Sequence, residues 1–241
     1  MRLLVRSWNL YHGRTDPVSR GLYLARMVRL VTADAPDIVA LQEVPLWALG
    51  WLERWSGMAV SWAVTVPSLL VAPAARRLTE LDPVRFRSMV TGQANALLTN
   101  PHFELGPQRL LLMNPGVSRW AWFVRRGHQQ RYCQAVPVTA HGRGLLVANL
   151  HATNDARLAE GETVRATDFV RDAERCILCG DFNVNRHAVP GFSSPIEGID
   201  QILVRGLELE RGPEAWPAER RVIGGRLLSD HAPVEAVVAW T

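Results

Sequence analysis

Polar residues of catalytic types follow the apolar segments of this chain, at the points where those segments end. Asn or Asp alone at such a point is ordinary turn chemistry. Glutamate and histidine, together with a repeated Asp–His–Asn set, are instead residue types that bind hard cations and move protons. The positions are Asn9, Glu43, Asn149, His151, Asp181, Asn183, Asp200 and the triplet Ser229-Asp230-His231.

Short motifs surround these positions and occur in a fixed order along nearly the whole chain. They are Ser7-Trp8-Asn9, Leu41-Gln42-Glu43-Val44, Asn149-Leu150-His151, Gly180-Asp181-Phe182-Asn183, Ile199-Asp200 and Ser229-Asp230-His231-Ala232-Pro233. This ordered set resembles the endonuclease/exonuclease/phosphatase superfamily, also called DNase I-like. The resemblance implies a four-layered α/β sandwich, in which two packed β-sheets are flanked by helices. It also implies hydrolysis of phosphoesters that depends on a divalent metal.

The expected cofactor is Mg²⁺ or Mn²⁺. Magnesium takes oxygen ligands, often one or two carboxylates with water and substrate phosphate. Glu43 follows a fully apolar segment and is the predicted primary ligand, with Asn9 and Asp230 assisting it.

Two residue pairs carry the predicted catalytic chemistry. Asp181 and Asn183 are two residues apart, so both side chains would face the same way on an extended segment. The carboxylate would orient or deprotonate the attacking water, and the amide would donate to a phosphoryl oxygen. Asp200 would fix the tautomer of His231 and favour its charged form. His231 would then stabilise transition-state charge or act as a base, and both roles stay open. By resemblance, His151 would donate to the scissile phosphate.

The predicted substrate-binding residues are Asn95, His12, Asn149 and Tyr132. By resemblance, Asn95 lies at a position close to the site, and Tyr132 is similar to a phosphate-binding tyrosine of some relatives. Tryptophans interleaved with arginines would either stack bases or pack as a hairpin on the sheet. These residues are Arg119, Trp120, Trp122, Arg125, Arg126 and Arg131.

The predicted partner is a phosphoester substrate, and nucleic acid is the first candidate. The protein would then be a nuclease or phosphodiesterase in which water attacks in line. The alternative is a phosphatase or a sphingomyelinase-like phospholipid-headgroup hydrolase, because only the pocket walls would differ. A non-catalytic binding protein is a third possibility, although such proteins usually lose the Asp–His–Glu set. The segment Asn9-Leu10-Tyr11-His12-Gly13 departs from the pattern of relatives that repair abasic DNA, and this disfavours that branch.

The elements that must position these residues are mostly strands, with a few helices between them. Apolar runs predict the strands, and apolar residues at helical spacing predict the helices. The tryptophans 47, 51 and 55 predict a core-facing helical stripe. Strands are expected at Leu3–Trp8, Ile38–Gln42, Met58–Val66, Gln93–Thr99, Tyr132–Thr139, Gly144–Leu150, Cys176–Cys179, Gly198–Val204 and Ala232–Val238, and helices at Val18–Thr32, Pro45–Trp55 and Asp155–Asp172, whereas Leu69–Met89 stays unassigned.

Composition places the chain among ordinary globular proteins, because 48% of its 241 residues are hydrophobic and 21% are charged. No linker interrupts it, so we expect a single domain over residues 1–241. The net charge is +4, and all 27 basic residues are arginine, which permits a phosphate-bearing partner without establishing one.

Cys176 and Cys179 have the spacing of a metal or redox motif but lie in an apolar run, so they are predicted to be core thiols on opposite faces of a strand. No leader peptide and no uninterrupted apolar span is expected. The predicted location is cytoplasmic, without stable membrane insertion, and the sequence leaves protein partners unknown.

Overall fold

Strands from both halves of the chain build the first of two large sheets. The structure is a computed structural model that describes residues 1–19, 21, 23–82, 88–117 and 129–241. Within this sheet β1 and β3 are parallel, and the other neighbouring strands are antiparallel. Its order is β12 (Leu207–Ala215), β15 (Val234–Trp240), β1 (Arg2–Asn9), β3 (Ile38–Val44), β5 (Gln93–Thr99) and β4 (Ala59–Val66).

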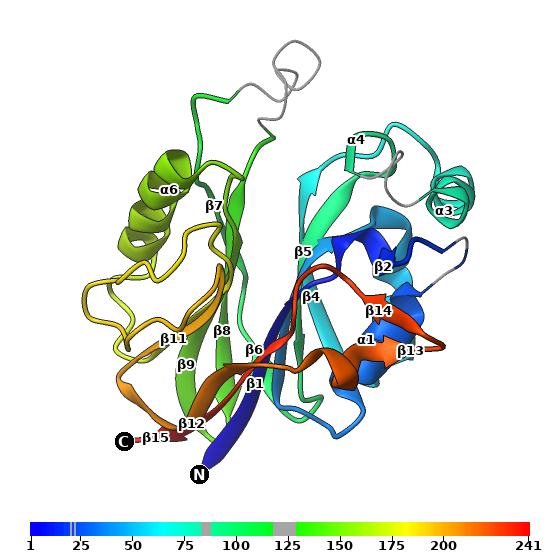
Figure 1. Cartoon of the computed structure of the whole chain (residues 1–241). Helices are drawn as coiled ribbons and strands as arrows, with labels where there is room; N and C mark the ends of the chain where they lie inside the picture. Colours follow the sequence, from blue (N-terminus) through cyan, green and yellow to red (C-terminus); the bar gives the residue numbers. More distant parts are fainter. Residues whose placement is uncertain (20, 22, 83–87, 118–128) are drawn as a thin grey trace.

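The second large sheet lies face to face with the first (Figure 1). Here β9 and β10 are parallel, and the other pairs are antiparallel. Its order is β11 (Asp200–Arg205), β10 (Cys176–Asp181), β9 (Arg143–His151), β8 (Tyr132–Ala140) and β6 (Glu104–Leu105), and β7 (Arg109–Leu112) also pairs with β8. A small third sheet joins β13 (Val222–Ile223), β14 (Arg226–Leu228) and β2 (Thr15–Asp16).

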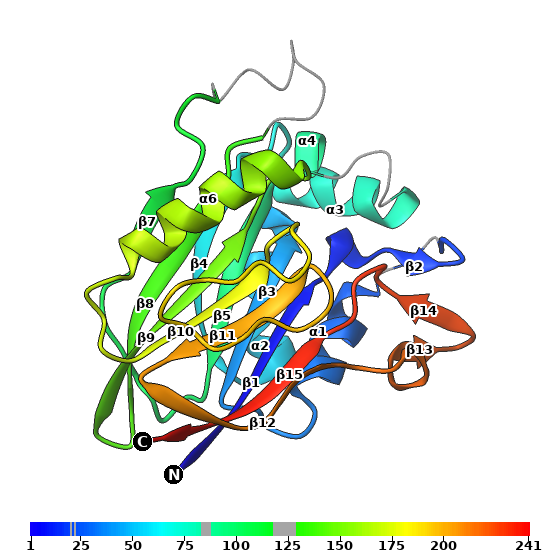
Figure 2. The ribbon, with the colours of Figure 1, turned by 60° about the vertical axis from the view of Figure 1, so that its left-hand side comes forward.

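Helices cover the outer faces of both large sheets (Figure 2). The first sheet carries α1 (Leu24–Thr32), α2 (Leu52–Ser56), α3 (Ala72–Leu81), the short α4 (Ser88–Thr91) and the 3-10 helices η1 (Tyr11–Gly13) and η2 (Leu46–Trp51) on its side, and η3 (Ala218–Arg221) precedes β13. The second sheet carries α6 (Ala156–Phe169). The side chain of Asp155, the residue before this helix, caps its first turn by accepting from the backbone amides of Arg157 and Leu158. None of the helices in the described ranges is long and apolar enough to cross a membrane.

Three apolar clusters separate these layers. One lies between the sheets and contains Ile38, Ala40 and Cys179. The second lies between the first sheet and its helices and contains Val39 and Leu41, which alternate with the inward residues of β3. The third lies between the second sheet and α6. Three apolar layers require four layers of structure, so the predicted four-layered α/β sandwich is confirmed.

The cysteines behave as predicted. Cys176 packs under α6, whereas Cys179 packs between the sheets, so the two thiols lie on opposite faces of β10. Both are buried and free, as is Cys133. Burial raises the pKa of all three thiols, which leaves them protonated and inert.

The predicted helix Pro45–Trp55 is wrong in its geometry. The segment forms η2 and then α2, and the three residues per turn of a 3-10 helix break the helical phase between Trp47 and Trp51. Trp47 and Trp55 pack on the core, but Trp51 is 38% exposed, so the expected core-facing stripe fails at Trp51.

Other boundaries also differ. Helix α1 begins at Leu24 instead of residue 18, and the unassigned Leu69–Met89 segment contains α3. The sequence missed β12, an edge strand of mostly exposed and charged residues that lacks an apolar run. The interleaved tryptophans and arginines at 119–126 lie outside the described residues.

Candidate active site

Four predicted residues meet where the carboxyl ends of parallel strands reach the same edge of the sandwich. Asn9 ends β1, Glu43 lies near the end of β3, and His151 and Asp181 end β9 and β10 side by side. Asn9 Nδ2 donates to Asp181 Oδ2 at 3.0 Å. His151 Nε2 lies 3.5 Å from Asp181 Oδ2 and 3.8 Å from Glu43 Oε1. Both sheets therefore contribute to one polar cluster.

Two further predicted residues join this cluster from the C-terminal half. Antiparallel pairing of β10 with β11 sets Asp200 opposite Asp181. The loop after β14 carries His231, whose Nδ1 donates to Asp200 Oδ2 at 2.7 Å and whose Nε2 lies 3.9 Å from Asp181 Oδ2. The ligand atoms of Asp181, Asp200 and His231 all lie within 4.8 Å of one another. The predicted histidine–carboxylate pair is thus present in the structure.

The backbone is distorted to aim Glu43 at this cluster. Strict alternation would place Glu43 beside the outward-facing Leu41. The register of β3 shifts against β5 between Leu41 and Val44, and Glu43 has a left-handed φ of 53°. Left-handed backbone is also found at His12 (φ 54°), Asn183 (φ 52°) and Ser229 (φ 57°). Non-glycine residues adopt this conformation rarely, and such strain concentrates at functional sites.

Burial and neighbouring charges raise the pKa of Asp181 and His231 and lower the pKa of His151. Burial and the Asp200 carboxylate raise the pKa of Asp181 to about 7. Burial alone would lower the pKa of His231, but the hydrogen bond to Asp200 and the surrounding carboxylates raise it to about 9. Burial and the Arg131 cation lower the pKa of His151 well below its usual range. At neutral pH the site therefore pairs a cationic His231 with a neutral His151.

Arg131 is a buried cation that the sequence singled out only within the set of interleaved tryptophans and arginines. Its Nη1 lies 3.1 Å from Nδ1 and 3.0 Å from Nε2 of His151, and the Glu43 and Asp181 carboxylates lie near enough to interact with its charge. Its Nε is buried and has no hydrogen-bond partner among the described residues. A buried guanidinium with unused donors suits an anionic group of a ligand. The interleaving with tryptophans pointed to Arg131, but it did not distinguish Arg131 from Arg119, Arg125 and Arg126.

Glu162, which the sequence did not predict, and the predicted Asn183 hold the loops of the site. Glu162, buried in α6, accepts from the Thr153 amide at 2.6 Å and the Thr153 hydroxyl at 2.5 Å. Asn183 Nδ2 donates to the Ala152 carbonyl at 2.9 Å, so the turn after His151 is held from two sides. This amide of Asn183 thus bonds the backbone in the structure.

The loop that carries His231 is fastened by Arg221. Arg221 Nη1 donates to the carbonyl oxygens of Leu228, Ser229 and His231 at 3.1, 2.9 and 3.1 Å. Trp8 Nε1 also donates to the His231 carbonyl at 2.9 Å. Ser229 Oγ donates to the Asn9 carbonyl at 2.8 Å, which ties this loop to the end of β1.

The predicted substrate-binding residues lie in different places. His12 is buried in the cluster, with Nε2 3.2 Å from Gln93 Oε1 and 3.5 Å from Glu43 Oε2. Asn95 Nδ2 donates to the Tyr132 carbonyl at 3.1 Å, which bridges the two sheets. The hydroxyl of Tyr132 donates to Gln130 Oε1 at 3.1 Å.

Asn149 requires a correction. It is fully buried between the sheets, its Nδ2 donates to the carbonyls of Leu41 and Ala96, and its Oδ1 accepts from Gln42 Nε2. All of its polar groups are engaged by protein, so this geometry bridges the sheets and does not offer a substrate contact.

Asp230, a predicted metal ligand, lies at the surface beside the cluster. Its side chain is exposed, and its Oδ1 accepts from Ser229 Oγ at 3.4 Å. It lines a cavity of about 290 Å³ beside Asp200 and His231.

The remaining carboxylates fit a hard divalent cation. Glu43 Oε2 and Asp200 Oδ1 are buried oxygens that take no hydrogen bond from any residue the structure describes. A buried carboxylate oxygen without a donor is costly unless a cation or water satisfies it. Oxygen donors of this kind are what Mg²⁺ and Mn²⁺ prefer.

Comparisons with known proteins agree with this arrangement. The model of the endonuclease/exonuclease/phosphatase family matches residues 7–231. No curated protein matches the sequence. Among solved structures, an endonuclease/exonuclease/phosphatase from Beutenbergia cavernae is similar with a TM-score of 0.72 and 17% identity, covering 99% of this chain and 72% of that one.

Two further solved structures are similar over nearly their whole length. D. rerio TDP2 complexed with a single-strand DNA product has a TM-score of 0.68 and 13% identity, with 98% of each chain covered. The mannosyl-6-phosphatase of Bacteroides thetaiotaomicron has a TM-score of 0.63 and 18% identity, with 99% of this chain and 100% of that one covered. At these identities the likeness establishes the shared fold. The endonuclease/exonuclease/phosphatase family is generally dependent on a divalent metal.

Proposed function

Because the chain belongs to the endonuclease/exonuclease/phosphatase family, whose named activities all hydrolyse phosphoesters, we propose that it is a divalent-metal-dependent phosphodiesterase that acts on nucleic acid. One observation carries the proposal: Asp181 lies in contact with Asn9, His151 and His231, which come from three different parts of the chain. The bound single-strand DNA product of the similar TDP2 structure supports nucleic acid as the substrate class.

Glu43 and Asn9 are the residues proposed to hold the metal. Glu43 offers the buried Oε2, and Asn9 adds an amide oxygen that already accepts from the Tyr11 amide at 3.0 Å. When bound, Mg²⁺ or Mn²⁺ would supply a Lewis acid that polarises the phosphoryl oxygen and stabilises the leaving oxygen. Asp230 is omitted from this set because its side chain is exposed and its Oδ1 accepts from Ser229 Oγ.

Asp181 is proposed to orient the attacking water and accept its proton. Its Oδ2 accepts from Asn9, and its Oδ1 accepts from the Asn183 amide at 3.0 Å, so the carboxylate is held from both ends. The backbone N–H of Asn183 would thereby position Asp181. The side-chain Nδ2 of Asn183 could reach a phosphoryl oxygen only by releasing the Ala152 carbonyl. A fixed orientation supplies much of the advantage of an enzyme over solution.

His231, His151 and Arg131 are proposed to bind the oxygens of the phosphoryl group through hydrogen bonds. Asp200 fixes Nδ1–H of His231, so the Nε2 edge faces Asp181 and the substrate. Arg131 and His151 lie together beside Asp181, where their N–H groups would donate to the remaining oxygens. Preorganised donors around a phosphorane-like transition state stabilise the charge that develops there.

A phosphatase acting on a small monoester is the second candidate. The cavity of about 290 Å³ beside His231 is lined by Ile196, Ile199 and Ala232, and it would accept a small leaving group. The fold of the mannosyl-6-phosphatase supports keeping this candidate.

A hydrolysis panel with and without Mg²⁺ and Mn²⁺ tests the proposal. The substrates are single-stranded and duplex DNA, RNA, bis-p-nitrophenyl phosphate, p-nitrophenyl phosphate and sphingomyelin vesicles. Diester turnover should require the metal and fall with Glu43→Gln, whereas Glu160→Gln, an exposed residue of α6, serves as the matched control. Turnover that survives a chelator, or that Glu43→Gln leaves intact, would contradict the proposal, and a preference for the monoester would favour the phosphatase.

A further inference from the structure

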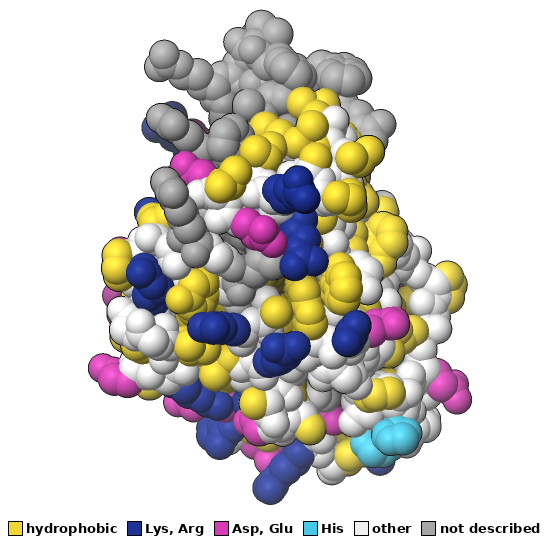
Figure 3. Space-filling view, turned by 90° about the vertical axis from the view of Figure 1, so that its right-hand side faces the viewer, with side chains coloured by type: hydrophobic (Ala, Val, Ile, Leu, Met, Phe, Trp, Pro, Cys, Tyr) yellow, Lys and Arg dark blue, Asp and Glu magenta, His cyan; other side chains and the backbone are white. Residues whose placement is uncertain are grey.

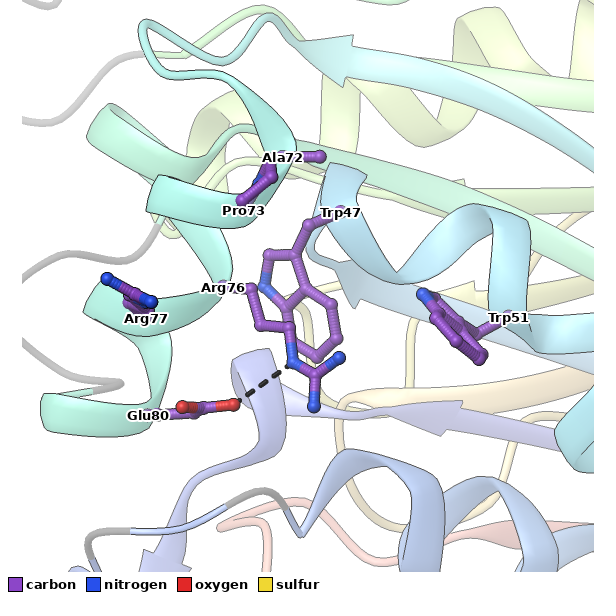
Figure 4. A pocket seen from close by; sticks show the side chains of 7 residues that line it. All are labelled: Trp47, Trp51, Ala72, Pro73, Arg76, Arg77 and Glu80. Carbon is purple, nitrogen blue, oxygen red and sulfur yellow. Dashed lines mark hydrogen bonds and ion pairs between the residues drawn. The ribbon is translucent and has the colours of Figure 1, made fainter.

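A groove outside the catalytic cluster is lined by residues of η2 and α3 (Figure 4). Its volume is about 440 Å³. Trp47 and Trp51 of η2 form one wall, and Pro73, Arg76, Arg77 and Glu80 of α3 belong to the other. No step of the proposed hydrolysis uses these residues.

Contacts within the protein hold the two tryptophan rings of the η2 wall in place. Trp47 Nε1 donates to Thr79 Oγ1 at 3.0 Å, which fixes the indole against α3. Trp51 stacks on Trp55 with 6.3 Å between ring centroids and 16° between planes, yet it remains 38% exposed. An exposed indole that is supported from behind offers a flat apolar surface at little cost in side-chain entropy.

On the α3 wall of the groove, the guanidinium of Arg76 lies beside the ring of Trp47. Arg76 Nε donates to Glu80 Oε1 at 3.0 Å, and its guanidinium carbon lies 5.8 Å from the centre of the Trp47 ring. Figure 4 shows its two terminal nitrogens turned away from Glu80, toward the side of the groove where Trp51 lies. A planar fork of this kind suits a phosphate group.

Arginines also surround the groove. Arg77 is an exposed residue of the groove wall, and the Arg54 guanidinium lies 5.7 Å from the centre of the Trp51 ring. Figure 3 shows basic side chains scattered among hydrophobic ones over the face of the molecule that carries α3. An occupant of this groove should therefore combine a flat ring with an anionic group.

We propose that the groove binds a nucleotide of a single-stranded nucleic acid whose scissile phosphate lies at the catalytic cluster. The base would stack on Trp51, and the backbone phosphate would bond Arg76 and Arg77. Stacking platforms combined with cations are how proteins hold single strands without reading their sequence. The proposal rests on the proposed function and assigns single strands as its substrate class.

The position of the groove along the chain fits this path. Trp51 follows Glu43 by eight residues, so their Cα atoms are at most about 29 Å apart. The proposal therefore requires a strand of several nucleotides between the two places.

Anisotropy of a labelled oligothymidylate in a chelator tests binding without cleavage. Trp51→Ala should weaken binding by about 5- to 150-fold, the range for removal of a stacking side chain. Trp51→Phe should restore part of the affinity. Arg76→Gln should reduce the slope of log affinity against log salt by about 0.7, the value for one phosphate contact on a single strand. A strand of the same length without bases should not respond to Trp51→Ala.

Matched controls come from surface residues outside the groove. Trp62→Ala removes an indole that is 46% exposed on β4, and Arg171→Gln removes an arginine side chain that is 70% exposed. Both should bind as the wild type does, and thermal unfolding of every variant checks that the fold is intact. Groove variants that bind like these controls would overturn the proposal.

A second readout separates this proposal from the proposed function. The ratio of kcat/KM for the oligonucleotide to kcat/KM for bis-p-nitrophenyl phosphate should fall about tenfold or more in Trp51→Ala. If no ester is turned over but oligonucleotide binding still depends on Trp51, the proposed hydrolysis fails and the groove stands. Binding of phosphoinositide vesicles that depends on Trp51, without binding of the oligonucleotide, would overturn the groove proposal in favour of a lipid surface.

Discussion

The amide of Asn9 donates a hydrogen bond to the Asp181 carboxylate across 3.0 Å, and this bond joins the two large sheets at the candidate active site. Asn9 ends β1 in the first sheet, and Asp181 ends β10 in the second. Glu43 belongs to the first sheet and His151 to the second, so the same division runs through the rest of the cluster. The site exists only where the two sheets meet.

His231 and Asp200 should act as one unit. His231→Ala is expected to lower kcat by roughly 10²- to 10⁴-fold, the range for loss of a group that handles protons or charge in the transition state. Asp200→Asn should lower it as well, because the carboxylate that accepts from Nδ1 at 2.7 Å is lost. The double variant should be little worse than His231→Ala alone, since residues in one network are not additive. Kinetics of the three variants on the preferred ester measure this, and additive losses would show that the two residues act independently.

Arg221 should position His231 without touching substrate. Arg221→Met removes a guanidinium that bonds three carbonyl oxygens, each bond having a net value of about 1 kcal/mol. We expect kcat to fall about tenfold or more with little change in KM, and we expect Arg221→Lys to recover part of the loss. The matched control is Arg226→Met, whose exposed guanidinium donates to the Pro17 carbonyl at 2.7 Å. A rise in KM with unchanged kcat would assign Arg221 to substrate binding instead.

Gly180 should tolerate no side chain. Its φ is 137°, and a Cβ at this position would lie 1.9 Å from the Leu150 carbonyl oxygen. Because β9 and β10 would have to separate, Gly180→Ala is expected to reduce the free energy of unfolding by at least about 3 kcal/mol. Gly144→Ala in the neighbouring β9 meets nothing within 4 Å and should change it by about 0.5 kcal/mol or less. Denaturant unfolding of both variants tests the contrast, and equal stabilities would contradict it.

Asp34 should make stability depend on pH at the acidic end. Hydrogen bonds from the buried Arg6 guanidinium hold the pKa of Asp34 below its usual range. A lowered pKa stabilises the fold above the unfolded value of about 3.9, and this contribution is lost as the pH falls through the folded value. Since the Asp34 side chain is 52% exposed, screening limits the effect of Asp34→Asn to about 1 kcal/mol at pH 7.

The difference in unfolding free energy between wild type and Asp34→Asn should therefore shrink below about pH 4. Asp172→Asn, at a side chain that is 96% exposed, is the control and should show no such trend. A difference that stays constant down to pH 2 would contradict the assigned role of Asp34.

Much of the cluster could be predicted from the sequence because parallel strands end at a common edge. Asn9, His151 and Asp181 end apolar strands, and that pattern is visible in one dimension. The error at Asn149 has a geometric cause. It lies two residues before His151 on the same inward face of β9, and one step deeper in that row is the space between the sheets.

The supporting residues could not be predicted in the same way. Arg131, Glu162 and Arg221 are single charged residues whose partners lie 20, 9 and up to 10 positions away along the chain. Charged residues usually indicate a solvated surface. Only the folded chain reveals that these three are buried. The break between η2 and α2 was equally hidden, because short 3-10 turns are frequent at the ends of α-helices.

Division of the candidate site between the two sheets has a consequence for folding kinetics. Each sheet can form its own hydrogen-bonded ladders, but Asn9 meets Asp181 only after the sheets dock. During refolding, catalytic activity should therefore appear with the docking step and later than strand formation. The rate at which turnover recovers would then measure docking of the two sheets, and the circular dichroism signal would measure strand formation separately.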